Sequence, residues 1–138
     1  MRQPEQVKRD LTRSWLVKAK EDLNAANVLL SYNLSVQSAV GFHSQQAAEK
    51  FLKALLTWYQ IEFPKTHNLG ELLDLISKVN PDLADSLHHI TALNPYGIEY
   101  RYPADLPEVT PEQARSALDL AETVQQAIQN VLPSDLAL

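Results

Sequence analysis

Apolar residues recur with helical spacing along most of this chain. In the first segment, steps of three and four residues place five of them on one stripe about 80° wide, at about 100° per residue. These residues are Trp15, Ala19, Leu23, Ala26 and Leu30. The two-residue alternation that is typical of a half-buried strand does not persist anywhere in the chain. The pattern therefore predicts an all-α protein.

A second helix is predicted from about Ser35 to Gln60. Its apolar residues spread over half of the helix surface, and they are Ala47, Ala48, Phe51, Leu52, Leu55, Trp58 and Tyr59. A face of that width contacts more than one neighbour, so we expect this helix at the centre of a bundle. Pro64 ends the segment, because the residue before a proline avoids helical backbone angles.

Capping residues mark the starts of two further helices. Asn68, with Glu71 three residues later, predicts the third helix. Asn80, followed by Pro81 at the first helical position, predicts the fourth. We expect the fourth helix to be continuous, with an apolar stripe of Leu83, Leu87, Ile90 and Leu93.

The rest of the chain completes a helical bundle. Residues 94–109 contain three prolines and predict a long connection, and a capping box of Thr110 and Gln113 then starts the last helix. Together these features predict an antiparallel up-and-down bundle of four to five helices over residues 12–132. Residues 1–11 are expected to form a flexible basic N-terminal segment, and residues 133–138 a short tail.

The charge distribution changes this picture only locally. A net charge of −5 argues against bulk electrostatic binding to nucleic acid, which needs a basic surface. However, residues 1–20 hold six basic and two acidic side chains, whereas residues 104–138 hold six acidic side chains and Arg115. Two interpretations remain open: solvated helix faces, or a local basic patch that binds phosphates or an acidic partner.

Composition excludes several classes of chemistry. The chain of 138 residues has no cysteine, which excludes disulfides, thiolate catalysis and cysteine-ligated zinc. It has three glycines and no glycine-rich phosphate loop, and neither a His-Glu-x-x-His motif nor a paired acidic spacing predicts a metal site. We therefore predict no cofactor and no metal. There is no apolar run of about 18 residues and no secretory signal, so we expect a cytoplasmic protein without a membrane span.

A strip of polar residues on the second predicted helix is the first candidate site. His43, Gln46, Lys50 and Lys53 share an arc of about 80° at helical spacing. Ammonium, amide and imidazole groups together can bind a phosphate or the edge of a nucleobase. Alternatively, the two lysines lie on the solvent-exposed side of the helix, with Glu49 and other surface acids as their ion partners.

Lys65 and His67 lie directly before the third predicted helix. Helix N-termini attract anions through unpaired N–H groups and the helix dipole, so these two side chains are candidates for an anion site. The alternative is that Asn68 merely caps the helix.

Arg101 and Tyr102 form a third candidate inside the proline-interrupted connection, together with Tyr96 and Tyr100. An arginine flanked by aromatic rings can stack on bases and bind phosphate with its planar guanidinium. Equally, the rings can close the end of the bundle while Arg101 pairs with Glu99 or Asp105.

Three blocks of the sequence, in this order, resemble the HEPN domain. They are Phe42–Leu56 (FHSQQAAEKFLKALL), Pro64–Leu69 (PKTHNL) and Tyr100–Pro103 (YRYP), and the resemblance spans roughly residues 12–131. It implies a five-helix up-and-down bundle that is commonly dimeric. Many relatives are thought to bind nucleotides or RNA. Some are encoded beside a minimal nucleotidyltransferase as a toxin–antitoxin pair, in which the HEPN protein is a metal-independent ribonuclease.

The resemblance does not extend to the ribonuclease motif of the family. That activity relies on an arginine and a histidine four to six residues apart, and no histidine follows Arg101 in this chain. The usual acid–base imidazole for RNA cleavage is therefore missing, and we predict no catalytic residue.

The sequence thus predicts a HEPN-like homodimer that binds a nucleotide, RNA or a nucleotidyltransferase partner. The residues expected around its binding groove are His43, Gln46, Lys50, Lys53, Lys65, His67, Arg101 and Tyr102. One alternative is a metal-independent ribonuclease toxin in which Arg101 holds the phosphate and His67, His43 or Asp105 is a non-standard acid–base. The other is a non-catalytic dimeric scaffold.

Overall fold

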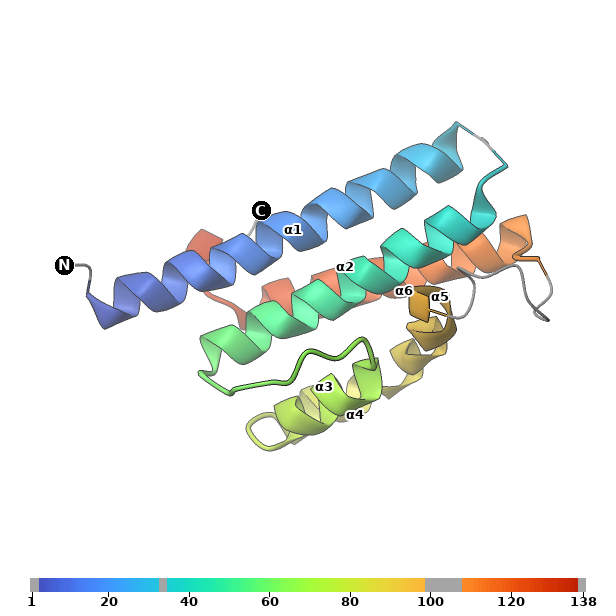
Figure 1. Cartoon of the computed structure of the whole chain (residues 1–138). Coiled ribbons are helices and arrows are strands. Elements are labelled where there is room, and N and C mark those ends of the chain that lie inside the picture. Colours follow the sequence, from blue (N-terminus) through green and yellow to red (C-terminus); the bar gives the residue numbers. More distant parts are fainter. Residues whose placement is uncertain (1–2, 33–34, 99–107, 137–138) are drawn as a thin grey trace.

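The computed structural model describes residues 3–32, 35–98 and 108–136. Three long helices, α1 (Pro4–Ser31), α2 (Gln37–Trp58) and α6 (Pro111–Val131), form its body. Figure 1 shows α2 and α6 running in the same direction and α1 running in the opposite one. The described part of the chain contains helices and no strand, so the predicted all-α bundle is confirmed.

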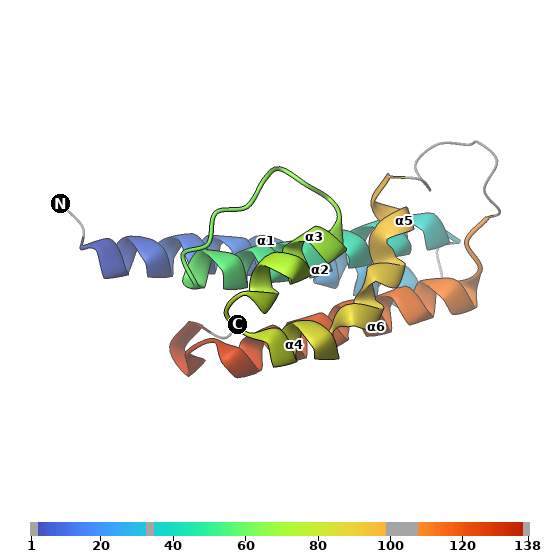
Figure 2. The ribbon, with the colours of Figure 1, turned by 90° about the horizontal axis from the view of Figure 1, so that it is seen from below.

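Short helical segments pack on the side of α2 opposite α1 (Figures 1 and 2). They are α3 (Leu69–Ser77), α4 (Pro81–Ser86), the 3₁₀ segment η1 (His88–Leu93) and α5 (Asn94–Ile98). The predicted fourth helix is therefore not continuous, because α4 ends at Ser86 and a tighter 3₁₀ segment follows. The predicted long connection is also shorter, because α5 occupies its start; Pro95 is tolerated there in the first helical turn.

The predicted capping residues define the helix starts. The side-chain oxygen of Asn68 accepts hydrogen bonds from the backbone N–H groups of Gly70 and Glu71, and that of Asn80 accepts one from Leu83. At the start of α6, Thr110 and Gln113 each accept a hydrogen bond from the other's backbone N–H, which is a complete capping box. These starts are confirmed because each cap is a local interaction within four residues.

The N-terminal segment differs from its predicted flexibility. Helix α1 begins at Pro4, so most of residues 1–11 is helical. Two of its basic side chains have partners on other elements: Lys8 Nζ lies 3.8 Å from the ring centre of Trp58, and Arg9 pairs with Asp135 in η3 (Ser134–Leu136). These partners stabilise turns of the helix that precede Trp15, the first residue of its predicted apolar stripe.

Helix α2 is the centre of the core, as predicted from its wide apolar face. Ala47, Ala48, Phe51, Leu52 and Leu55 are all buried, whereas Trp58 and Tyr59 are half-buried at its C-terminal end. It contacts α1, α6, α3 and α5. Several polar residues of this helix are therefore buried as well, namely Ser44, Gln45, Gln46, Glu49 and Lys53. No helix in the described ranges is both long enough and apolar enough to span a membrane.

Two glycines allow α5 to approach the N-terminal half of α2. A Cβ atom built on Gly41 would lie 2.4 Å from Cδ1 of Tyr96, and one built on Gly97 would lie 2.8 Å from Cδ of Gln45. Both distances are far below van der Waals contact. Each helix thus offers a glycine to a side chain of the other, and a larger residue would require that side chain or α5 to shift.

We expect Gly41→Ala to lower the free energy of unfolding by about 1–3 kcal/mol, because its methyl group overpacks against the Tyr96 ring. The sign is informative, since alanine by itself favours a helix over glycine by about 1 kcal/mol. Urea unfolding followed by circular dichroism measures the change. In a Tyr96→Ala background the cost should vanish; a cost that persists there would show that the contact with Tyr96 is not its cause.

Candidate functional site

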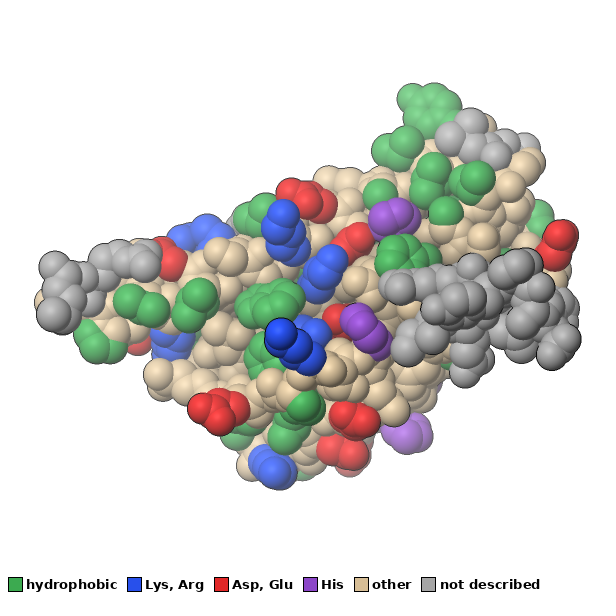
Figure 3. All heavy atoms as spheres, viewed as in Figure 1, with side chains coloured by type: hydrophobic (Ala, Val, Ile, Leu, Met, Phe, Trp, Pro, Cys, Tyr) green, Lys and Arg blue, Asp and Glu red, His purple; other side chains and the backbone are tan. Residues whose placement is uncertain are grey.

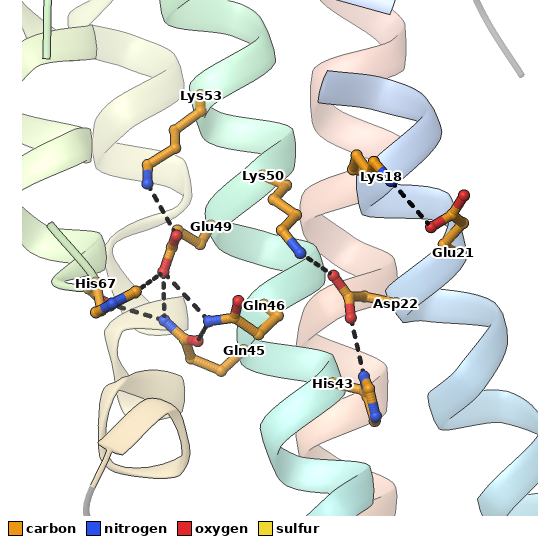
Figure 4. A network of polar contacts seen from close by, with 10 residues as sticks. All are labelled: Lys18, Glu21, Asp22, His43, Gln45, Gln46, Glu49, Lys50, Lys53 and His67. Carbon is orange, nitrogen blue, oxygen red and sulfur yellow. Dashed lines mark hydrogen bonds and ion pairs between the residues drawn. The ribbon is translucent and has the colours of Figure 1, made fainter. Parts of the chain in front are cut away.

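One side of α2 carries six polar side chains within the otherwise apolar bundle. At about 100° per residue they cover an arc of about 160°, twice the width of the strip seen in the sequence. They are His43, Gln45, Gln46, Glu49, Lys50 and Lys53, and we call them the polar face of α2. Figure 4 shows that the side chains of this face form two clusters, one centred on Glu49 and the other on Asp22 of α1.

Glu49 is the centre of the first cluster. Only 3% of its surface is exposed, and both carboxylate oxygens accept hydrogen bonds. Oε2 lies 2.9 Å from Nζ of Lys53, and Oε1 lies 2.9 Å from Nδ1 of His67. The side-chain amides of Gln45 and Gln46 donate to Oε1 over 3.3 and 3.5 Å. A buried carboxylate requires such partners, because its transfer from water is otherwise very costly.

Lys53 is buried with Glu49. Besides the ion pair, its ammonium lies 5.5 Å from the ring centre of Trp15 and 5.8 Å from that of Phe63. The two rings pack edge to face, 6.0 Å apart, and cover the pair. The ammonium of Lys53 therefore faces Glu49 and aromatic rings, so its role in the structure is to balance the buried charge.

His67 is attached to α2 by its backbone and by its ring. Gln45 donates from its amide to the carbonyl oxygen of His67 over 3.0 Å, while Nδ1 of the ring bonds to Glu49. A carboxylate can only accept, so Nδ1 carries the hydrogen and Nε2 is left without a partner in this cluster. Since 51% of the His67 side chain is exposed, the bundle presents this imidazole to solvent in a fixed orientation.

The second cluster joins α1 to α2. Asp22 accepts a hydrogen bond from Nδ1 of His43 over 2.9 Å with one oxygen and pairs with Nζ of Lys50 through the other. Asp22 is mostly buried, whereas about a third of the His43 side chain is exposed. His43 therefore resembles His67 in its arrangement: a carboxylate holds Nδ1, and no contact within the cluster involves Nε2.

The N-terminus of α3 does not provide free N–H groups for an anion. Asn68 accepts from Gly70 and Glu71, and the N–H of Leu69 donates to the side-chain oxygen of Asn94 over 2.8 Å. The prediction of an anion site was wrong in this respect, because two asparagines satisfy the groups on which it relied. Lys65 is exposed, and in the described ranges it has neither a hydrogen bond nor an ion pair.

The structure brings five of the eight predicted site residues together in two clusters at the polar face of α2. His43 and Lys50 meet at Asp22, while Gln46, Lys53 and His67 meet at Glu49. Figure 3 shows basic, acidic and histidine side chains gathered at the middle of this face of the molecule. Arg101 and Tyr102 lie outside the described residues, so their part in the site stays a prediction.

Sequence reasoning missed Asp22 and Gln45 as members of the clusters. It also did not predict that Glu49 is buried at the centre of one of them. A signal for Glu49 was present, because Gln45 and Lys53 lie four residues before and after it and share its side of a helix that is apolar on most others. No comparable signal marks Asp22, whose partners come from another helix. Within the described part of the chain, no three His, Asp or Glu side chains are grouped as a metal ion would need.

Comparisons with known proteins agree with this architecture. The sequence-family model of the HEPN domain matches residues 12–131 of this chain. The fold is similar to the crystal structure of TT1696 from Thermus thermophilus, with a TM-score of 0.72 and 29% sequence identity. That similarity covers 88% of this chain and 98% of TT1696. Among the curated proteins, none matches this chain.

We expect Glu49→Ala to lower the free energy of unfolding by about 3–5 kcal/mol, because it leaves the ammonium of Lys53 buried without a counter-charge. Urea denaturation measures the loss. Glu122→Ala, at an exposed position of α6, is the matched control and should change stability by no more than about 0.5 kcal/mol. Equal effects of the two substitutions would contradict the central role of the Glu49 cluster. Adding Lys53→Met to Glu49→Ala should recover part of the loss, because it removes the stranded charge.

Proposed function

Because this chain belongs to the HEPN domain family, we propose that it binds RNA or a nucleotide on the polar face of α2. The observation that carries the proposal is the pair of imidazoles, His43 and His67, each held at Nδ1 by a mostly buried carboxylate. At Nε2 a neutral ring accepts a hydrogen bond from the edge of a base, and a protonated ring donates one to a phosphate oxygen. In both cases the ring is already fixed, so little side-chain freedom is lost on binding. The resemblance to relatives that are thought to bind nucleotides or RNA supports the same conclusion.

The predicted site residues divide into two roles in this proposal. His43, Lys50, Lys65 and His67 contact the ligand, because their polar groups reach the surface. Gln46 and Lys53 act behind them by holding Glu49 in place. Arg101 and Tyr102 would complete the site with a phosphate contact and a stacking ring.

The charge balance of the face limits the kind of ligand. Lys50 and Lys53 each pair with a carboxylate. Lys65, two residues before His67, has no counter-charge among the described residues. We therefore propose a ligand that is read by hydrogen bonds and one or two phosphate contacts, such as a nucleotide or a short single-stranded segment. The overall charge of −5 agrees with such a small electrostatic contribution.

Lys65→Ala and His67→Ala should each weaken binding of a labelled single-stranded oligoribonucleotide or of a mononucleotide. A hydrogen bond to a charged group contributes about 1.5–3 kcal/mol, so the dissociation constant should rise about tenfold or more. Fluorescence anisotropy or calorimetric titration measures it. With one or two phosphate contacts, log K should fall against log salt concentration with a slope of only about −0.7 to −1.4.

Lys78→Ala is the control for this experiment, since Lys78 is an exposed lysine at the far end of α3. It should leave affinity unchanged. An oligoribonucleotide and a mononucleotide that bind wild type and His67→Ala equally well would contradict the assignment of the polar face.

A second candidate function, a metal-independent ribonuclease toxin, is favoured by the pairing of Glu49 with His67. A carboxylate that holds Nδ1 of an imidazole fixes its tautomer and leaves Nε2 to accept or donate a proton, as in acid–base catalysts. In this proposal His67 replaces the histidine that the family motif would place after Arg101, and Arg101 holds the scissile phosphate.

RNA cleavage in metal-free buffer tests this second candidate. We expect cleavage by the wild type to be lost in both Arg101→Ala and His67→Ala and retained in His89→Ala, at an exposed histidine of η1. Growth arrest on expression should follow the same pattern. Cleavage that survives Arg101→Ala would contradict the role assigned to Arg101. If neither the wild type nor any variant cleaves RNA, binding is left as the function of the site.

We also propose self-association of this chain and a nucleotidyltransferase partner in a cytoplasmic toxin–antitoxin pair. The support is the resemblance to HEPN proteins that are commonly dimeric and are encoded beside such enzymes. A dimeric scaffold without a ligand is the remaining alternative, and the titrations above separate it from the binding function.

A further inference from the structure

The outer surface of α1 carries a second regular pattern, separate from its buried stripe. Eight residues follow one another at alternating steps of four and three, which is the heptad spacing of a coiled-coil seam. They are Val7, Leu11, Ser14, Lys18, Glu21, Ala25, Val28 and Tyr32, and we call them the α1 seam. At about 38 Å, this series spans nearly the whole length of the helix.

The large side chains of the α1 seam are exposed. Leu11 is 53% exposed, Val28 is 52% exposed and Tyr32 is 72% exposed, and Val17 beside them extends the apolar surface. In the space-filling view, hydrophobic side chains gather at the end of the molecule where α1 finishes (Figure 3). Single exposed apolar residues are ordinary, but a series at heptad spacing along one helix is typical of a surface that packs against another helix.

The α1 seam shows the same order of residue types whether it is followed from its N-terminal or its C-terminal end. Apolar residues occupy both ends, the small residues Ser14 and Ala25 lie next, and Lys18 and Glu21 occupy the centre. These two charged side chains are exposed, lie 3.8 Å apart and are separate from the contacts that cross to α2 (Figure 4). Two copies of such a seam that run in opposite directions therefore place apolar residues against apolar residues and Lys18 against Glu21.

We propose that the α1 seam packs antiparallel against the same seam of a second copy of this chain. In this register Leu11 faces Val28 of the second copy, Ser14 faces Ala25, and Lys18 faces Glu21, with each contact made twice about a two-fold axis. The inference rests on the self-association proposed above and assigns its surface and register.

Charge selects the antiparallel arrangement. A parallel pair would oppose Lys18 to Lys18 and Glu21 to Glu21 at the centre of the seam, whereas the antiparallel pair creates two Lys–Glu contacts. The apolar ends are equally well matched in both arrangements. The central charges therefore determine the direction, and they offer a way to test it.

Sedimentation velocity of the full chain at micromolar concentration is the first test. Lys18→Glu or Glu21→Lys alone opposes like charges across the axis, and either should raise the dimer dissociation constant at least tenfold. The double variant Lys18→Glu/Glu21→Lys restores opposite charges and should restore the dimer. Both positions are exposed, so circular dichroism should show unchanged helix content in all three variants.

Cysteine cross-linking then tests the register, because the chain contains no cysteine of its own. Positions 11 and 28 of one helix are about 26 Å apart, so a disulfide, which needs Cα atoms within about 7 Å, cannot form within one copy. Leu11→Cys/Val28→Cys should give a covalent dimer on mild oxidation. Each single variant should not, because like positions are equally far apart in the pair.

The outcomes separate this inference from the functions proposed above. A monomeric wild type would overturn both self-association and the seam. A dimer that persists in Lys18→Glu, or that fails to cross-link through positions 11 and 28, would overturn the seam alone. Oligoribonucleotide binding is measured on the same variants and is expected to be unchanged, since Lys65 and His67 lie on other segments.

Discussion

The burial of the Glu49 charge is the constraint on which the arrangement around α2 depends. A carboxylate inside a helix bundle must be fully hydrogen-bonded, and its partners come from several directions. Lys53 balances the charge and brings Trp15 and Phe63 over it, so α1 and the segment after α2 are fixed together. His67 bonds to the same carboxylate, which holds the segment before α3. One buried group thus determines how α1, α2 and the connection between α2 and α3 meet.

The sequence predicted those parts of the fold that are encoded locally. Each cap, such as Asn68 or Thr110, is satisfied within a few residues, and the apolar stripe of α1 needs only helical spacing. The errors lie where distant contacts decide. Helix α1 extends to Pro4 because Trp58 and Asp135 provide partners for its basic residues. Likewise α5 forms inside a proline-containing stretch because glycines allow it to pack on α2.

The arrangement of the candidate site was predictable to the same extent. Helical spacing alone placed His43, Gln46, Lys50 and Lys53 on one side of α2, and the structure confirms that they share this side. The packing of neighbouring helices against α2 decides which lysine is buried and which acidic residue it pairs with. Asp22 belongs to α1, so no spacing within α2 could reveal it as the partner of Lys50.

The parallel course of α2 and α6 has a consequence for the order of folding. Helices α1 and α2 are joined by residues 32–36 and form a local hairpin, whereas α6 packs on α2 only after residues 59–110 have been crossed. Closing the longer loop costs more chain entropy than closing the short one. The hairpin therefore assembles early, and the rate at which the core is completed is governed by the return of α6, whose contacts with α2 are far less local than those of the hairpin.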